Sequence, residues 1–462
     1  HQTADMSGKV CLVTGARVKI GFHITLKLLR AGATVIATSR FPVDMLDRFR
    51  AEKDSESWMP TAQSAAAAAA AATTEEGATT GTAGSLRLHG FGLDLRDIGN
   101  LDRFVAFLGD RFGRLDVIVN NACQTVRRPP SFYKHLLERE MVGLASITGS
   151  GGEAGGAAPT AARSTNSDGS GAAHAHGSSL DGYLSFMQCG SGNGVGAHPP
   201  MLQSAPSTAV ETDNKEGGSC PRVNPSAVSL STFPSAPLPA FLTSIPSAAL
   251  SQMPMMPSDV CDGSSESAKQ FPENVFDVNN QQVDLRRHNS WRMRLHEVPT
   301  PELAEVFAIN AMAPFLLNSR LKALMMIRMS SSSGDDACCS KFIINVSAME
   351  GKFNRYKAPH HPHTNMAKAA LNMMTRTSAA DYSKDSIFMN AVDTGWINEE
   401  APAEVAAAIA AKHNFQTPID EIDAAARVLD PVFVGVSMDH NPADTNTPPY
   451  GLFYKDYRPT DW

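Results

Sequence analysis

The chain has 462 residues, with 40 basic and 47 acidic side chains and a formal net charge of −7. This slight acidic excess gives no electrostatic reason to expect nucleic acid or an anionic membrane as a partner. No apolar run approaches the roughly 20 residues that a membrane-spanning helix needs. The 7 cysteines are odd in number and include no C-x-x-C pair. This usage is typical of a reducing compartment such as the cytoplasm or an organelle matrix.

Three stretches of low complexity interrupt the chain. They are rich in alanine, glycine, serine and threonine and span residues 62–85, 147–275 and 329–340. Such segments bury too little apolar area to offset the entropy of the chain, so their composition predicts disordered or loosely packed loop insertions.

The rest of the sequence alternates between short apolar runs and amphipathic stretches. We expect strands at residues 10–13, 34–38, 86–93, 115–119, 342–346 and 386–392, and helices at 20–31, 101–112, 301–326 and 364–382. This alternation predicts an α/β fold, a Rossmann-like doubly wound parallel sheet with helices on both faces. One domain would comprise residues 8–146 and 276–462, interrupted by the insertion 147–275 and ending in a segment for substrate or subunit contact.

The first strand runs into a turn with the sequence Thr-Gly-Ala-Arg-Val-Lys-Ile-Gly. Gly15 and Gly21 supply two of the three glycines of a dinucleotide-binding turn, and Lys19 takes the place of the middle one. Glycine lets the backbone approach a pyrophosphate, and the helix that begins near Ile20 favours negative charge at its first N–H groups. The alternative is a glycine turn without a ligand.

The second strand ends at Ser39 and Arg40, with no acidic residue there. A carboxylate at this point would bind the ribose 2′-hydroxyl of NAD, whereas a hydroxyl followed by a guanidinium suits the 2′-phosphate of NADP. Arg17 and Lys19 add positive charge nearby. We therefore expect NADP rather than NAD, the alternative being a solvated loop arginine.

Further motifs follow the third and fourth strands. Asp94 and Leu95 follow the third, and the sequence Asn-Asn-Ala-Cys follows the fourth. Together with the glycine turn, these motifs resemble the short-chain dehydrogenase/reductase family. The resemblance implies that Asp94 and Leu95 border the adenine, and that Asn121 and Ala122 support the sheet beside the cofactor. Cys123 replaces the final glycine of that motif.

The resemblance also implies a working set of asparagine, serine, tyrosine and lysine. Asn310 matches the asparagine, which holds a water in the proton path. Ser347 matches the serine that holds the substrate carbonyl, and Lys368 matches the lysine that binds the nicotinamide ribose. Gly395 lies in the loop that touches the nicotinamide amide. At the tyrosine position the chain has Thr364.

An aliphatic hydroxyl is far too weak an acid for proton transfer near neutral pH. Three other proton sources are open: Tyr356 from the preceding loop, His363 or His361, and a water held by Thr364 with the serine and the lysine. Imidazole titrates in the useful pH range. The histidine run at 360–363 also suggests a metal, but no distant cysteine or carboxylate set completes a site, so we expect none.

Three functions compete on this evidence. The first is an NADP(H)-dependent oxidoreductase of short-chain type, acting on a small carbonyl or alcohol through an atypical proton donor. The second is a catalytically impaired subunit of a larger assembly, favoured by Thr364, Lys19 and Cys123. The third is a redox sensor that binds NADPH without turnover. The resemblance also implies a homo-oligomer.

Overall fold

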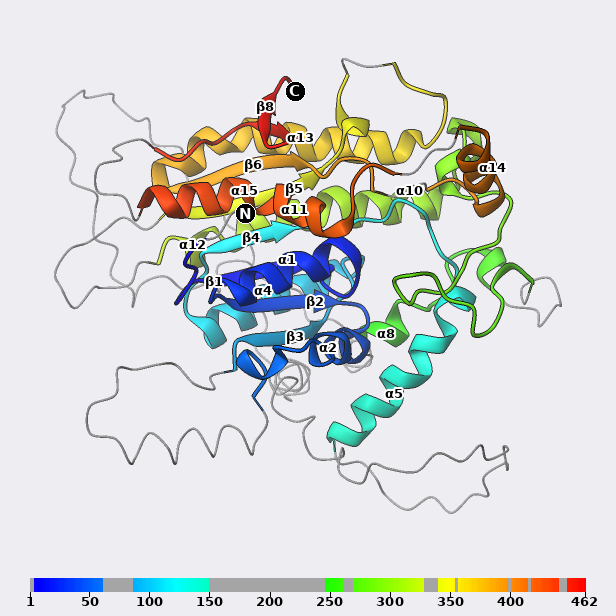
Figure 1. The fold of residues 1–462 in the computed structure, drawn as a ribbon, viewed down its shortest axis with the longest axis horizontal. Coiled ribbons are helices and arrows are strands. Elements are labelled where there is room, and N and C mark those ends of the chain that lie inside the picture. Colours follow the sequence, from blue (N-terminus) through cyan, green and yellow to red (C-terminus); the bar gives the residue numbers. More distant parts are fainter. Residues whose placement is uncertain are drawn as a thin grey trace, which may run out of the picture.

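The computed structural model describes residues 4–60, 86–148, 246–260, 269–327, 340–353, 356–397, 400–413, 417–439 and 447–462. Within these ranges the strands form one sheet of order β3-β2-β1-β4-β5-β6-β7-β8 (Figure 1). The strands are β1 (Val10–Thr14), β2 (Thr34–Ser39), β3 (Leu88–Gly92), β4 (Val117–Asn120), β5 (Lys341–Ser347), β6 (Ile387–Asp393), β7 (Phe453–Lys455) and β8 (Arg458–Thr460). All neighbouring strands are parallel except β7 and β8.

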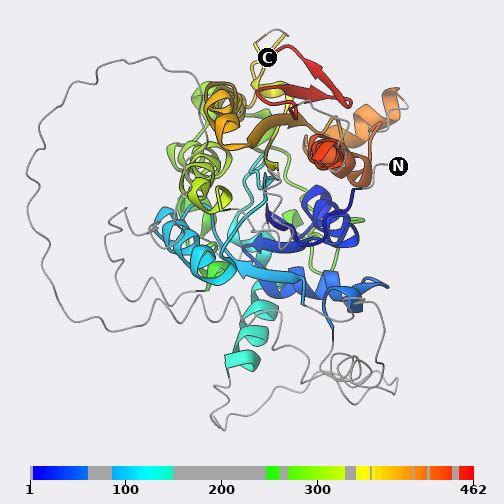
Figure 2. The ribbon, with the colours of Figure 1, turned by 90° about the vertical axis from the view of Figure 1, so that its left-hand side faces the viewer.

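Helices cover both faces of the sheet. They are α1 (Lys19–Arg30), α2 (Pro42–Arg50), α4 (Ile98–Phe112), α5 (Lys134–Thr148), α8 (Ser247–Leu250), α10 (Thr300–Phe307), α11 (Ala313–Arg320), α12 (Lys322–Met325), α13 (Pro362–Tyr382), α14 (Ala403–His413) and α15 (Glu421–Asp439). Figure 2 shows α1 and α15 on one side of the sheet and α4, α11 and α13 on the other. The predicted Rossmann-like doubly wound sheet is confirmed.

The strand sequences explain this layering. A strand covered on both faces needs apolar side chains at successive positions rather than at alternate ones. Leu12 and Val13 in β1, and Ile343 and Ile344 in β5, are all fully buried. On α1, Ile24 and Leu28 recur at the helical spacing and face the same core. The central strands are therefore continuous apolar runs, as expected for parallel strands between two helical layers.

A buried ion pair joins the start of β1 to β5 and β4. The Asp116 carboxylate accepts a hydrogen bond from the Val10 N–H at 2.7 Å and forms ion pairs with Arg114 and with Lys341. Both Asp116 and Lys341 are almost completely buried. Burial raises the pKa of Asp116, but the Lys341 ammonium more than offsets this, and the pKa lies below its usual range. The pair fixes the end of the sheet opposite to the predicted cofactor site.

The predicted helix at 301–326 is interrupted. It begins as α10, passes through a π-helix at Ala308–Met312, and continues as α11 and α12. A π-helix adds one residue to a turn, which rotates the following side chains relative to a regular helix. The helices α2, α5, α14 and α15 and the strands β7 and β8 were not predicted.

Most of the three low-complexity stretches lies outside the described residues. Residues 62–85 lie outside the described residues, and so do 329–339 of the third stretch. Of the central insertion, 149–245 and 261–268 lie outside as well, whereas 246–260 is described. Across the described ranges, no helix combines the length and apolarity that membrane crossing requires.

Candidate active site

Two glycines and one lysine shape the turn between β1 and α1. Gly15 has a φ of +69° and Lys19 a φ of +54°, both in the left-handed region. A Cβ at Gly15 would lie 2.9 Å from Ala122 Cα, and one at Gly21 would lie 2.1 Å from the Gly15 carbonyl oxygen. Only glycine therefore fits at the two glycine positions. Lys19 adopts the conformation that the missing middle glycine would adopt freely, at a cost in backbone energy.

The loop after β4 supports this turn. Asn121 Nδ2 donates to the carbonyl oxygens of Thr14 at 3.1 Å and Gly15 at 3.2 Å. The backbone N–H groups of Asn121 and Ala122 both donate to Thr14 Oγ1 at 3.0 Å. The ends of β1 and β4 are thus locked together at the carboxyl edge of the sheet. The contribution of Thr14 was not recognised in the sequence.

The first turn of α1 faces this edge with its backbone donors. The helix begins at Lys19, the preceding Val18 provides no side-chain cap, and its first turn contains no acidic residue. The first N–H groups of a helix have no partner within the helix and carry its positive dipole end. An anion such as a pyrophosphate would satisfy them at Ile20 and Gly21.

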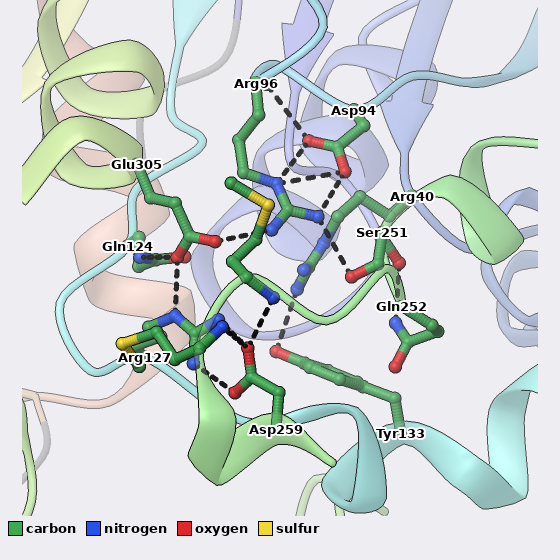
Figure 3. Close-up of polar contacts among 12 residues, drawn as sticks. Arg40, Asp94, Arg96, Gln124, Arg127, Tyr133, Ser251, Gln252, Asp259 and Glu305 are labelled. Carbon is green, nitrogen blue, oxygen red and sulfur yellow. Dashed lines mark hydrogen bonds and ion pairs between the residues drawn. The ribbon is translucent and has the colours of Figure 1, made fainter. Parts of the chain in front are cut away.

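The two arginines predicted to lie near the 2′-phosphate, Arg40 at the end of β2 and Arg17 in the turn after β1, have different environments. Ser39 Oγ accepts a hydrogen bond at 3.0 Å from the backbone N–H two residues later. Arg40 Nη2 donates to the Tyr133 hydroxyl at 2.8 Å (Figure 3). Arg17 instead forms a buried ion pair of 2.9 Å with Asp44. The charge of Arg17 is therefore largely neutralised, whereas Arg40 lies at the strand end.

At the end of β3, Asp94 is held by an arginine two residues later. Arg96 donates to both carboxylate oxygens of Asp94, at 3.0 and 2.7 Å, and to Glu305 at 2.8 Å. Burial raises the pKa of Asp94, but the hydrogen bond and charge of Arg96 outweigh it, so the pKa lies below its usual range. The Leu95 side chain is buried in the main core. Asp94 is thus an anion with a fixed partner.

Residues 246–260 form a cover segment over this part of the carboxyl edge. Ser247 Oγ donates to the carbonyl oxygen of Arg40 at 2.9 Å. Arg96 Nη2 donates to the carbonyl oxygen of Ser251 at 3.0 Å. The two contacts attach a piece of the predicted insertion beside the ends of β2 and β3, and Figure 3 shows the one between Arg96 and Ser251.

A second attachment of the cover segment runs through a charged network. Arg127 donates to both carboxylate oxygens of Asp259 at 2.6 Å and to Glu305 at 2.8 Å. Gln124 Nε2 also donates to Glu305, at 3.1 Å. Figure 3 shows these side chains converging from the loop after β4, α10 and the cover segment. The network lies beside the carboxyl edge and links the insertion to the helix that leads to Asn310.

Asn310 lies in the π-helix and is 1% exposed. Its Oδ1 accepts a hydrogen bond from the Gln124 N–H at 2.8 Å, and its Nδ2 donates to the Gln124 carbonyl at 3.0 Å. Both polar ends of the side chain therefore bind one backbone position in the loop after β4. This contact fixes the loop and the helix relative to each other.

Ser347 and Lys368 meet at the carboxyl end of β5. Ser347 is the last residue of the strand, and its Oγ donates to Asn372 Oδ1 at 2.5 Å. Lys368 Nζ donates to the carbonyl oxygen of Val346 at 2.8 Å. Both side chains are buried. Asn372 is one helical turn beyond Lys368 on α13, and it was missed because its partner is distant in sequence.

Thr364 and His363 are adjacent in the first turn of α13, and each is 2% exposed. Among the described residues, the Thr364 hydroxyl and both His363 ring nitrogens have no hydrogen-bond partner. His363 Nε2 lies 3.5 Å from Glu302 Oε1 on α10. Burial raises the pKa of Glu302, but His363 and Ser290 more than offset this, so the pKa falls below its usual range.

The other candidate proton donors lie elsewhere. Tyr356 is 91% exposed and points to solvent. His361 stacks on Trp291 with ring centroids 3.8 Å apart, and its Nδ1 lies 2.9 Å from the Trp291 carbonyl oxygen. Within the described ranges, no three histidine, cysteine, aspartate or glutamate side chains are grouped to share a metal ion.

Gly395 follows β6 at the same edge of the sheet. Its φ is +86°, and its N–H donates to Asp393 Oδ1 at 2.7 Å. A Cβ here would lie 2.3 Å from Ile419 Cδ1. The loop therefore needs glycine for its backbone conformation, whereas the Ile419 side chain could move away from a Cβ.

A known protein family matches part of the second half of the chain. The family model described as enoyl-(acyl carrier protein) reductase matches residues 269–431, a range that includes Asn310, Ser347, Thr364, Lys368 and Gly395. Uncharacterized protein R665 of Acanthamoeba polyphaga mimivirus is 32% identical over 157 residues, covering 33% of this chain and 31% of the relative. The chain therefore matches about a third of that relative's length.

Two solved structures are similar at low identity. A short-chain dehydrogenase from Streptomyces avermitilis is 15% identical, with a TM-score of 0.42 and coverage of 97% of this chain and 89% of that one. The RhlG/NADP complex of Pseudomonas aeruginosa is 13% identical, with a TM-score of 0.43 and coverage of 97% and 96%. The family match covers about a third of the chain, and the strand order described above is the one expected from the resemblance to the short-chain dehydrogenase/reductase family.

Proposed function

We propose that this protein is an NADP(H)-dependent oxidoreductase of short-chain type, which moves hydride between the nicotinamide and a carbonyl or alcohol. The observation that carries the proposal is the joint placement of Ser347 and Lys368, both buried, at the carboxyl end of β5. Ligands of open parallel sheets bind at this edge. Ser347 and Lys368 each make one hydrogen bond within the protein, so two Lys368 N–H groups and the Ser347 oxygen remain for a polar ligand.

The residues fit a dinucleotide. Gly15 and Gly21 leave no room for a Cβ, which matches a turn that a pyrophosphate approaches closely. The first N–H groups of α1 would bind its oxygens, and Lys368 would bind the nicotinamide ribose. Arg40 at the end of β2 would bind a 2′-phosphate, which favours NADP over NAD.

The bound reduced nicotinamide would supply a hydride to the carbonyl carbon of the substrate. Ser347 would turn its single O–H from Asn372 Oδ1 to the carbonyl oxygen and so orient the substrate. As the C=O π electrons move to that oxygen, an acid must deliver one proton to it, giving the alcohol. Thr364 is too weak an acid for this step.

His363 is the proton donor that we propose. It is buried next to Thr364, and its ring nitrogens make no hydrogen bond within the described residues. The Glu302 carboxylate, 3.5 Å away, would stabilise the protonated imidazole before transfer. Tyr356 would have to turn from solvent into the site to compete.

Oxidation of NADPH against a panel of aldehydes and ketones tests the proposal. We expect His363→Gln to lower kcat about 100-fold, the size of a general acid's contribution, with the Kd for NADPH unchanged. Tyr356→Phe and Thr364→Val should retain turnover. Loss of turnover in Tyr356→Phe alone would assign the acid to the loop tyrosine.

The competing functions give other outcomes. Tight NADPH binding without turnover on any substrate would favour the catalytically impaired subunit or the redox sensor, for which replacement of the tyrosine by Thr364 is the supporting observation. Failure to bind either coenzyme would refute the proposal. We also propose a single domain of residues 8–146 and 276–462 and a homo-oligomer, which light scattering would test.

A further inference from the structure

Arg40 differs from the other arginines around the carboxyl edge. Each of Arg17, Arg96, Arg127 and Arg128 forms an ion pair with a carboxylate. In the described parts of the chain, the salt bridges include none for Arg40. Its guanidinium is held by aromatic side chains, and Asp94 acts on it only from beyond ion-pair distance, so an anion could still bind it directly.

The contacts of Arg40 define one orientation. The guanidinium carbon lies 4.7 Å from the Tyr133 ring centroid and 5.6 Å from the Phe41 ring centroid. Its Nη2 donates to the Tyr133 hydroxyl at 2.8 Å. A guanidinium has five N–H donors in a rigid plane, so this bond leaves the others available. Stacking on a ring fixes the plane in which they point.

Tyr133 is itself held in place. Its ring stacks on Phe41 at 5.3 Å and meets Phe132 edge-on at 4.9 Å. Phe41, Leu136 and Ala248 form a small second core between the end of β2, α5 and the cover segment, and Tyr133 packs against it. The residue lies in the long connection after β4, outside the motifs that resemble the family. Arg40 is therefore oriented by the connection that follows β4.

The charge around Tyr133 also affects its hydroxyl. Burial raises the pKa of Tyr133, but the charges of Arg40, Arg128 and Arg17 outweigh it, so the pKa lies below its usual value. Because Arg40 donates to the phenol oxygen, the phenol keeps its own O–H to donate to a further acceptor. A polarised O–H beside a guanidinium is a pair of donors suited to an anion with several oxygens.

We propose that Tyr133 is a positioning and specificity residue for the 2′-phosphate of NADP: its ring orients the Arg40 guanidinium, and its hydroxyl donates a second hydrogen bond to the phosphate. This inference rests on the proposed function. It adds that recognition of the phosphate depends on Tyr133 in the connection after β4 and not on the end of β2 alone.

The test measures affinity for two pairs of ligands that differ only by the 2′-phosphate. The pairs are NADPH with NADH, and adenosine 2′,5′-bisphosphate with AMP. For wild type we expect tighter binding of the phosphorylated member of each pair. Tyr133→Phe should weaken binding of that member about tenfold, the loss of one hydrogen bond to a charged group, and leave the other member unchanged. Tyr133→Leu, which also removes the ring, should weaken it further.

Tyr382→Phe is the matched control. Its hydroxyl donates to the Asn318 carbonyl at 3.1 Å, and Lys322 Nζ lies 4.5 Å from its ring centroid, so the same kinds of contact are lost at the end of α13. We expect this variant to bind all four ligands like wild type. Thermal unfolding of each variant shows whether the fold is retained.

Several results would overturn the inference. Equal weakening of both members of a pair in Tyr133→Phe would mean that the residue only supports the fold. Tighter binding of both in Tyr133→Leu would mean that the ring obstructs the site. Wild-type preference for NADH would refute the phosphate site while leaving the oxidoreductase proposal intact, whereas no binding of either coenzyme would refute both.

Discussion

Replacing Gly21 with alanine tests whether the turn after β1 holds a coenzyme. The added Cβ would lie 2.1 Å from the Gly15 carbonyl oxygen, and ordinary contact begins at 3.4 Å, so that oxygen must move by 3.4 − 2.1 = 1.3 Å. Displacement of a binding element by about 1 Å costs on the order of 100-fold. We therefore expect the Kd for NADPH to rise about 100-fold, equivalent to about 2.7 kcal/mol.

The control for this variant is Gly113→Ala. Gly113 has a φ of +67° at the end of α4, but a Cβ there would meet nothing within 4 Å. An alanine in this left-handed conformation should lower the free energy of unfolding by about 1–2 kcal/mol. This is similar to the roughly 1–3 kcal/mol expected from overpacking in Gly21→Ala. Urea unfolding should therefore show comparable losses, while a fluorescence titration with NADPH separates the two variants. A Gly21→Ala protein that binds NADPH as tightly as wild type would refute the reasoning.

Three further predictions concern other parts of the fold. Burial, and to a lesser extent the charge of Arg111, lowers the pKa of His89 to about 4. Since the folded state binds this proton less readily than the unfolded chain, the free energy of unfolding should fall by up to about 3 kcal/mol as the pH falls from 6.5 to 4. In urea unfolding, His89→Gln should lack that loss. Asp116→Asn leaves the Lys341 ammonium buried without its anion and should cost about 3–5 kcal/mol in the same assay; a cost below about 1 kcal/mol would contradict the pair's role. Asn372→Ala removes the side chain that holds the Ser347 Oγ in place, so kcat for carbonyl reduction should fall about tenfold with NADPH affinity unchanged. A change in affinity alone would assign Asn372 to the coenzyme site.

The strands of the sheet could be predicted because each is marked by a run of neighbouring apolar residues. The run at 342–346 is apolar at every position except Asn345, which indicates a strand covered on both faces, and the structure places β5 there. The glycine turn could be read for a similar reason, since Gly15 adopts a backbone conformation that most residues avoid. In both cases the physical constraint acts within a few residues.

Other features depend on contacts between distant segments. The π-helix around Asn310 leaves no mark on the apolar periodicity of 301–326, because one added residue shifts the pattern by less than the width of the buried face. The partner of Ser347 lies 25 residues away, on Asn372. Glu302 approaches His363 only because α10 packs against α13. Pairs of residues that meet only through helix packing cannot be predicted from their spacing in the sequence.

The attachment of the cover segment limits how far this chain can be shortened. Deleting residues 246–260 would remove Asp259, the bidentate partner of Arg127, and would leave that guanidinium with Glu305 alone. Gln124, whose backbone binds Asn310, also belongs to this network. A truncation that removed the whole insertion would therefore weaken the contacts of the helical segment that carries Asn310. A shortened protein for crystallisation should therefore bridge the chain from residue 149 to residue 245 and keep the segment that follows.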